Sequence, residues 1–223
     1  METKMRLKDY IQERSDRAER RYYSLPINFL EIEENGATKV DENTITGYAA
    51  VFNSDSEDLG GFIERIAPGA FTGVLQDDAW AYLNHSINHP LGRNGKNLTL
   101  YQDDRGLRYK VNLLDNTDGN NARILVRAGI IYKSSFAFIA AEEVFTKGDP
   151  SNGVPHVRTI TKMERLFDVS PLSTDPAYMD TSVAARSLKK INGVDEIQKA
   201  LEMQKYKFRR RKHEHNYNQL FKF

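Results

Sequence analysis

Three stretches of this sequence each carry one side chain suited to acyl-transfer chemistry. Ser135 lies in an apolar segment after Gly129, His85 ends the apolar run that begins at Trp80, and Asp168 stands between two apolar neighbours further along the chain. A hydroxyl nucleophile, an imidazole base and a carboxylate that orients the imidazole make up the working set of a serine nucleophile site. We therefore predict that Ser135, His85 and Asp168 form a catalytic triad.

Two adjacent serines compete for the role of nucleophile. On a strand, Ser134 shares a face with Phe136 and Phe138, whereas Ser135 shares the opposite face with Ala137. The bulky aromatic face is expected to point into the core. The face with alanine leaves room for a peptide to approach, so the alternation favours Ser135.

The acid position has two further candidates, Glu164 and His156, both in the region between the serine and Asp168. An aspartate flanked by apolar residues on a strand points away from them and can accept the imidazole N–H. A Ser-His-His arrangement through His156 stays open, and Asp168 is the preferred acid.

A metal site is not expected. His85 and His89 have the H-x-x-x-H spacing of some zinc sites, but Ser86 stands where a glutamate would follow, and Pro90 comes directly after the second histidine. The chain has no cysteine, which excludes disulfides, thiol catalysis and thiolate metal sites. We expect neither a metal nor another cofactor.

Length and composition indicate a cytosolic protein. A chain of 223 residues with 39% hydrophobic and 28% charged residues fits one globular domain with polar tails. The N-terminus lacks the apolar centre of a secretory signal, and no window reaches the roughly 18 apolar residues of a membrane span. We therefore expect no membrane association.

The periodicity of apolar residues predicts many short strands and few helices. Strands are expected over residues 28–33, 44–52, 62–66, 80–83, 98–101, 107–113, 132–142, 154–163 and 165–172. Helices are expected over residues 5–23, 70–76 and 117–128, with Thr117 as the N-cap and Gly129 as the stop of the third. This order predicts a mainly β fold, an antiparallel barrel or sandwich with peripheral helices.

The chain is expected to divide into three parts. These are a charged helical arm over residues 1–26, a β core over residues 27–188, and a tail over residues 189–223 that is helix-prone and then disordered. The tail carries a basic run, Lys205–Lys212, which fits a solvated charge run, docking on an acidic protein or, least favoured, nucleic-acid binding.

Six blocks in this order resemble the prohead maturation protease family of tailed bacteriophages, a serine peptidase family related in fold to herpesvirus assemblin. The blocks are Gly47–Asn53, Phe62–Phe71, Leu83–His85 with Leu91–Arg93, Asp104–Leu107, Gly129–Phe138, and Leu166–Ser170 with Asp175–Tyr178. The resemblance covers about residues 45 to 185. This chain has Ala137 where the family often has glycine, and Asp168 where it commonly has glutamate.

The resemblance implies a fold and a function. The fold would be a closed or nearly closed antiparallel β-barrel with peripheral helices, similar to assemblin. The enzyme would be an endopeptidase inside the immature capsid, in the host cytoplasm. It would cut scaffold polypeptide, the scaffolding segment of the major capsid protein and its own termini, and it would act as a homodimer or larger self-assembly. The alternative is a non-catalytic capsid-assembly or scaffolding protein that binds partners through its charged arms.

Overall fold

The computed structural model describes residues 13, 17–23, 26–59 and 61–173 of the chain. Contacts divide these residues into two compact units. The first holds the described residues within 1–54, 65–144 and 159–179, and the second holds those within 55–64 and 145–158. The predicted C-terminal tail, with its basic run, lies outside the described residues. The boundaries expected for the arm, the core and the tail remain predictions.

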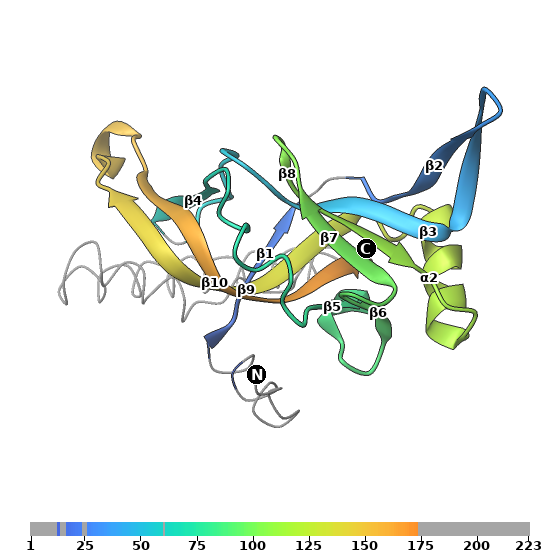
Figure 1. Ribbon diagram of the computed structural model, residues 1–223. Coiled ribbons are helices and arrows are strands. Elements are labelled where there is room, and N and C mark those ends of the chain that lie inside the picture. The colour runs from blue at the N-terminus through green and yellow to red at the C-terminus, as the bar shows by residue number, and fades with distance from the viewer. Residues whose placement is uncertain (1–12, 14–16, 24–25, 60, 174–223) are drawn as a thin grey trace, which may run out of the picture. The chain divides into compact units, whose positions relative to one another are not determined.

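One sheet carries the predicted triad segments. It has six strands, with β1, β9, β10, β5 and β6 in that order and β4 paired to β10. β9 therefore lies between β1 and β10, and β5 lies on the other side of β10 (Figure 1). The strands are β1 (Glu19–Tyr23), β4 (Phe62–Ile66), β5 (Trp80–Tyr82), β6 (Pro90–Arg93), β9 (Lys133–Thr146) and β10 (His156–Leu172). β10 and β5 run parallel, whereas β1 and β9 run antiparallel.

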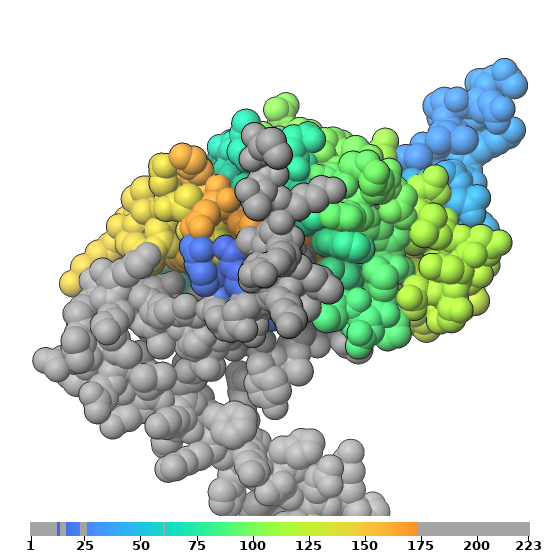
Figure 2. Space-filling model, turned by 60° about the horizontal axis from the view of Figure 1, so that its bottom comes forward, coloured from blue at the N-terminus to red at the C-terminus, as the bar shows by residue number. Residues whose placement is uncertain are grey.

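The other sheet has four antiparallel strands in the order β2, β3, β8 and β7. These are β2 (Asn28–Glu34), β3 (Ala37–Val51), β7 (Leu98–Gln102) and β8 (Gly106–Asn112). Asn35 and Gly36 join β2 to β3, and both have positive φ angles, as a two-residue hairpin turn of type I′ requires. The hairpin tip projects from the rest of the first unit (Figures 1 and 2).

The mainly β prediction is confirmed, but the expectation of a closed barrel is wrong. A barrel closes only when its first and last strands pair. Here one sheet ends at β1 and β6, and the other ends at β2 and β7. The sheets instead share one apolar core, to which both contribute fully buried residues such as Ile45, Tyr109 and Phe136. The expected likeness to assemblin stays a prediction.

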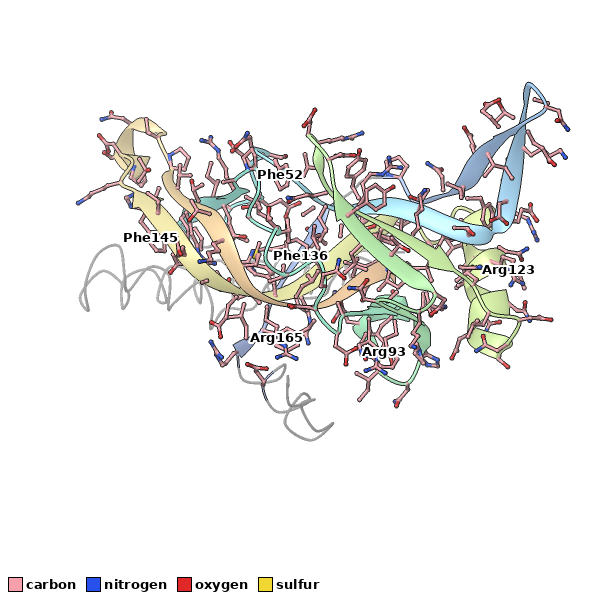
Figure 3. All side chains as sticks on the ribbon, viewed as in Figure 1. Phe52, Arg93, Arg123, Phe136, Phe145 and Arg165 are labelled. Carbon is pink, nitrogen blue, oxygen red and sulfur yellow. The ribbon has the colours of Figure 1, made fainter. Side chains whose placement is uncertain are left out.

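Aromatic packing fixes β9 against this core. The ring of Phe71 packs edge-on to that of Phe136, with centroids 5.6 Å apart, and Phe136 stacks on Phe138 at 4.8 Å. Phe52 extends the cluster from the end of β3, and its ring centroid lies 6.2 Å from that of Phe71. Phe52 and Phe136 are labelled in Figure 3. Such contacts add to the burial of large apolar side chains, and here they hold the aromatic face of β9 inward.

The helix prediction is confirmed over Thr117–Arg127, which forms α2. The N-cap is Asn116 rather than Thr117, because the Asn116 side chain accepts the backbone N–H of Gly119 at 2.8 Å. Gly129 follows the helix with a φ of 68°, as expected for its stop. The helix expected over residues 70–76 is absent. A series of turns with i to i+3 backbone bonds stands there instead, and Gly73 disfavours continuous helix.

Two other expectations about elements are wrong. Residues 19–23, expected to be helical, form strand β1, because pairing with β9 and the adjacent tyrosines favour extended backbone over helix propensity. The rest of the expected first helix lies mostly outside the described residues. The two strands expected over residues 154–163 and 165–172 form the single strand β10. No described helix is long and apolar enough to cross a membrane.

The second unit contains a buried ion pair. Arg158 donates to Glu64 at 2.7 Å, and their side chains are 3% and 2% exposed. Removing either partner would leave an uncompensated buried charge, which costs about 3–5 kcal/mol. Replacing one partner alone should therefore destabilise the second unit.

Candidate active site

The two serines of β9 lie in different surroundings. The Ser134 hydroxyl lies 2.9 Å from the Tyr109 hydroxyl, and Ser134 is fully buried. Burial raises the pKa of Tyr109 well above its ordinary value, so this phenol keeps its proton and hydrogen-bonds to Ser134 inside the core. The Ser135 hydroxyl instead contacts His85 and the backbone oxygen of Arg21. The strand alternation predicted these separate faces.

His85 lies in a strained turn that follows β5. Leu83–His85 form a short 3₁₀ segment, in which Asn84 and His85 have φ angles of 54° and 58°. Left-handed backbone is unfavourable for residues other than glycine, by about 1–2 kcal/mol each. The Asn84 side chain holds the turn in place, because it accepts the backbone N–H of Ser173 at 2.9 Å and donates to the Ser173 hydroxyl at 3.0 Å.

Asp168 lies in the C-terminal half of β10 and has no exposed surface. Its Oδ1 atom lies 2.6 Å from His85 Nδ1 and accepts the hydroxyl of Ser170 at 2.7 Å. A buried carboxylate is costly unless hydrogen-bond donors compensate for the lost water. Ser170 therefore helps to keep this oxygen in place beside the imidazole ring.

These three side chains form a continuous hydrogen-bonded series. His85 Nε2 lies 2.6 Å from the Ser135 hydroxyl oxygen, and His85 Nδ1 lies 2.6 Å from Asp168. With Nδ1 protonated and bonded to the carboxylate, Nε2 can accept the serine proton. The three residues come from β9, the turn after β5, and β10, so the sheet order brings distant segments together. The arrangement has the geometry of a general base next to an activated hydroxyl.

The two other candidates for the acid position have different partners. Glu164 binds Arg17 through two contacts of 2.8 and 2.7 Å. His156 accepts the backbone N–H of Gly148 at 3.0 Å. Of the three residues considered for this position, Asp168 is the one that contacts the imidazole.

His85 and His89 do not share a helical face. The His89 ring lies 3.0 Å from Asp118, whereas the His85 ring contacts Ser135 and Asp168. Across the described part of the chain, no group of three or more histidine, aspartate or glutamate side chains has the geometry of a metal site.

A pocket of about 370 Å³ lies between the His85 turn and α2. Its apolar lining comes from both elements, with carboxylate and amide groups at the helix side. The lining residues are Leu83, Asn84, Ser86, His89, Asp118, Asn121, Ile124 and Leu125. Two of them flank His85 directly, so the pocket is adjacent to the candidate reacting groups.

Sequence reasoning missed three parts of this site. Asn84 was missed because its role depends on its contact with Ser173, and Ser170 because its role depends on its contact with Asp168. Their closeness in sequence to His85 and Asp168 could have indicated both of them. The third is β1, whose Arg21 carbonyl accepts the Ser135 hydroxyl at 2.8 Å. No local pattern indicated this last contact, because the residues are 114 positions apart.

One family model matches most of this chain. The sequence profile of the family described as Caudovirus prohead serine protease matches residues 29–196. Among solved structures, the chain is similar to the bacteriophage T4 capsid assembly protease, with 12% identity and a TM-score of 0.39. That similarity covers 70% of this chain and 99% of the other. No curated protein sequence matches this chain significantly.

Proposed function

This chain belongs to the caudovirus prohead serine protease family, and from that premise we propose that it is a serine endopeptidase of capsid maturation. Its proposed substrates are the scaffold polypeptide, the scaffolding segment of the major capsid protein and its own termini. The observation that carries the proposal is the hydrogen-bonded series from Asp168 through His85 to Ser135.

The proposed reaction begins with proton transfer from the Ser135 hydroxyl to Nε2 of His85. The serine oxygen forms a bond to the carbon of the scissile carbonyl, and a tetrahedral intermediate results. His85 then gives its proton to the leaving amine, and the peptide C–N bond breaks to leave an acyl-enzyme. Water enters, gives a proton to His85 and bonds to the acyl carbon. The bond between that carbon and the Ser135 oxygen then breaks, and His85 returns the proton to the serine as the product acid leaves.

Asp168 has two roles in this reaction. Its carboxylate accepts Nδ1–H and so keeps the Nε2 lone pair directed at the serine. Its negative charge also stabilises the imidazolium that forms when His85 takes the proton. The Ser170 hydroxyl, bonded to the same carboxylate oxygen, acts as a positioning residue for Asp168.

The family also gives the setting in which the enzyme would act. We propose that it works inside the prohead, in the host cytoplasm, where capsid and scaffold proteins are its partners. High local concentration there would favour self-association by mass action. Sedimentation of the full chain over a range of concentrations tests this last point. A single monomeric species at all of them would contradict it.

The adjacent serines provide a matched pair of variants. Ser135→Ala removes the proposed nucleophile, whereas Ser134→Ala removes a hydroxyl that contacts Tyr109 in the core. We expect Ser135→Ala to abolish cleavage of co-expressed capsid and scaffold proteins, read by mass spectrometry of intact products. We expect Ser134→Ala to keep the same cleavage products and to lose about 1 kcal/mol of stability.

The cleavage results of these variants distinguish the proposed mechanism from its alternatives. Cleavage by Ser135→Ala at the wild-type level would refute the proposed mechanism. If Ser134→Ala loses cleavage and Ser135→Ala does not, Ser134 is the nucleophile and the assignment to Ser135 is wrong. A wild-type chain that cleaves nothing but binds capsid or scaffold protein would favour the non-catalytic assembly role.

A further inference from the structure

The proposed nucleophile lies against a peptide group of its own chain. β1 pairs antiparallel with β9, and Tyr22 stands opposite Ser135. The carbonyl oxygen of Arg21 accepts the Ser135 hydroxyl at 2.8 Å, and Ser135 is only 3% exposed. A second polypeptide therefore cannot reach this hydroxyl while β1 stays paired at that point.

The contact with Arg21 also gives the serine proton a second possible acceptor. A hydroxyl has one hydrogen, so Ser135 donates either to the Arg21 carbonyl or to His85 Nε2. When it donates to the carbonyl, Nε2 of His85 cannot take the serine proton until that bond breaks. The β1 carbonyl thus favours an arrangement that cannot start the reaction.

An extended peptide could pair with β9 on the side that β1 now occupies. β10 pairs with one side of β9, and β1 pairs with the other. Extended peptides commonly bind by adding a strand to a sheet edge, with backbone hydrogen bonds supplying affinity. A substrate that adds beside Ser135 in this way must take the place of β1.

We infer that β1 occupies the substrate strand's place in cis and holds the enzyme in an inhibited state until it is displaced. This inference rests on the proposed function. Residues Glu19–Tyr23 of β1 face Ser134–Phe138 of β9 over five residue pairs. We interpret β1 as inhibitory rather than as a bound substrate, because its Arg21 carbonyl contacts the serine hydroxyl through the oxygen and competes with His85 Nε2 for the one hydrogen.

The side chains of β1 stabilise it in this place without making it permanent. Arg21 and Glu19 form an ion pair of 2.9 Å with side chains 10% and 13% exposed, and the Arg21 guanidinium lies 5.7 Å from the centre of the Phe138 ring. The Lys133 ammonium lies 5.6 Å from the centre of the Tyr22 ring. A five-residue edge strand can still exchange with a competing strand. The apparent affinity for substrate is then the intrinsic affinity multiplied by the fraction of molecules in which β1 is displaced.

A reversible disulfide tests the inference in the full chain. The natural sequence has no cysteine, so Arg20→Cys with Ala137→Cys introduces one pair on facing positions of β1 and β9. Facing residues of an antiparallel pair lie close enough for a disulfide with little movement. Neither position is among the proposed catalytic residues. The two single-cysteine variants are the matched controls.

Cleavage of added capsid or scaffold protein is compared before and after reduction of the same sample. Oxidation should lower the cleavage rate of the double variant at least about tenfold, and reduction should restore it, because a tethered β1 keeps substrate out. Labelling of Ser135 by a fluorophosphonate probe should change in the same direction. The single variants should be unaffected by the redox treatment.

A proline variant changes the site in the opposite direction. Arg21→Pro removes the backbone N–H that points toward β9, on the same side as the Arg21 carbonyl, and also removes the ion pair with Glu19, so it should raise the rate of trans cleavage by about threefold or more. Glu33→Pro, on an exposed part of β2, is the matched control and should leave the rate unchanged.

Each result leads to a decision. Equal cleavage with the disulfide closed and open, or a slower Arg21→Pro variant that remains folded, overturns the inference and leaves the proposed function intact. A product that begins at Tyr22 also overturns it, since β1 would then be a substrate. If no form of the chain cleaves or reacts with the probe, the proposed function and this inference both fall.

Discussion

Replacing Asp168 by asparagine separates the charge of this residue from its shape. Asp168 has no exposed surface, and its Oδ1 atom contacts both His85 Nδ1 and the Ser170 hydroxyl. An asparagine can place its amide oxygen there and accept both bonds. It can also place its NH₂ group there and donate to Nδ1, which forces the ring proton onto Nε2. In that tautomer His85 cannot accept the proton of Ser135.

The structure sets the expected size of the effect. The Ser170 hydroxyl can donate to an amide oxygen or accept from an amide NH₂, so it does not select the active orientation. The charge that stabilises the imidazolium is lost in either orientation. The corresponding substitution in a serine protease triad lowers kcat by about 10⁴-fold, and we expect Asp168→Asn to lower kcat by about 10³–10⁴-fold.

Stability distinguishes a lost charge from a damaged fold. Asp168→Asn keeps the volume and the hydrogen-bonding positions, so the free energy of unfolding should change by less than about 1 kcal/mol. Asp168→Ala, the comparison variant, removes the acceptor for His85 and Ser170 and leaves a space in a buried strand. It should cost about 2–4 kcal/mol.

Three measurements check this reasoning. Cleavage of capsid or scaffold protein at saturating substrate gives kcat, and urea denaturation gives the free energy of unfolding. Proton NMR reads the downfield signal of a carboxylate-bound imidazole N–H, which should be present in the wild type and absent from Asp168→Asn. An Asp168→Asn variant that cleaves within about threefold of the wild-type rate would refute the assigned role.

Two further predictions concern the residues around the triad. Asn84→Gly keeps a residue suited to positive φ but loses the side-chain bonds to Ser173, whereas Asn84→Ala loses these bonds and adds backbone strain. We therefore expect kcat to fall further in the alanine variant than in the glycine variant. Equal kcat values in the two variants would show that the geometry of this turn does not limit the reaction. Burial raises the pKa of Tyr109, so the folded chain keeps a phenol proton that the unfolded chain loses above about pH 10. The free energy of unfolding therefore falls above that pH, by about 1.4 kcal/mol per pH unit from this one group. Tyr109→Phe should cost about 1 kcal/mol at neutral pH through the lost bond to Ser134, and urea denaturation should show its deficit shrinking above about pH 10; a deficit that stays constant with pH would contradict the raised pKa.

Local sequence patterns predicted much of the fold. The alternation of apolar residues located β4, β7 and β8 to within a few residues, because buried and less buried residues alternate along these strands. Apolar segments also located β2, β5 and β9. The same period separated Ser134 from Ser135. Thr117–Arg127 was identified as a helix, although its cap was misplaced by one residue.

Other features followed from pairing between distant segments. Helix-forming residues in the N-terminal segment did not prevent residues 19–23 from joining β9 as a strand. The prediction divided the long strand β10 in two, because the charged residues Lys162, Glu164 and Arg165 interrupt its apolar pattern. The sheets also stay open at their edges, since closure depends on which strands meet and not on how many there are.

The amino-acid sequence by itself determined which residues have reactive groups and which strand face each would occupy, because side-chain direction alternates along a strand irrespective of its neighbours. Only the tertiary structure decided that His85 lies between Ser135 and Asp168, 50 and 83 residues away, and that Arg21 lies over the serine. The physical reason is that a hydrogen bond requires atoms within about 3 Å. Strand order and the left-handed turn at His85 place the atoms at that distance, and both depend on packing across the whole first unit.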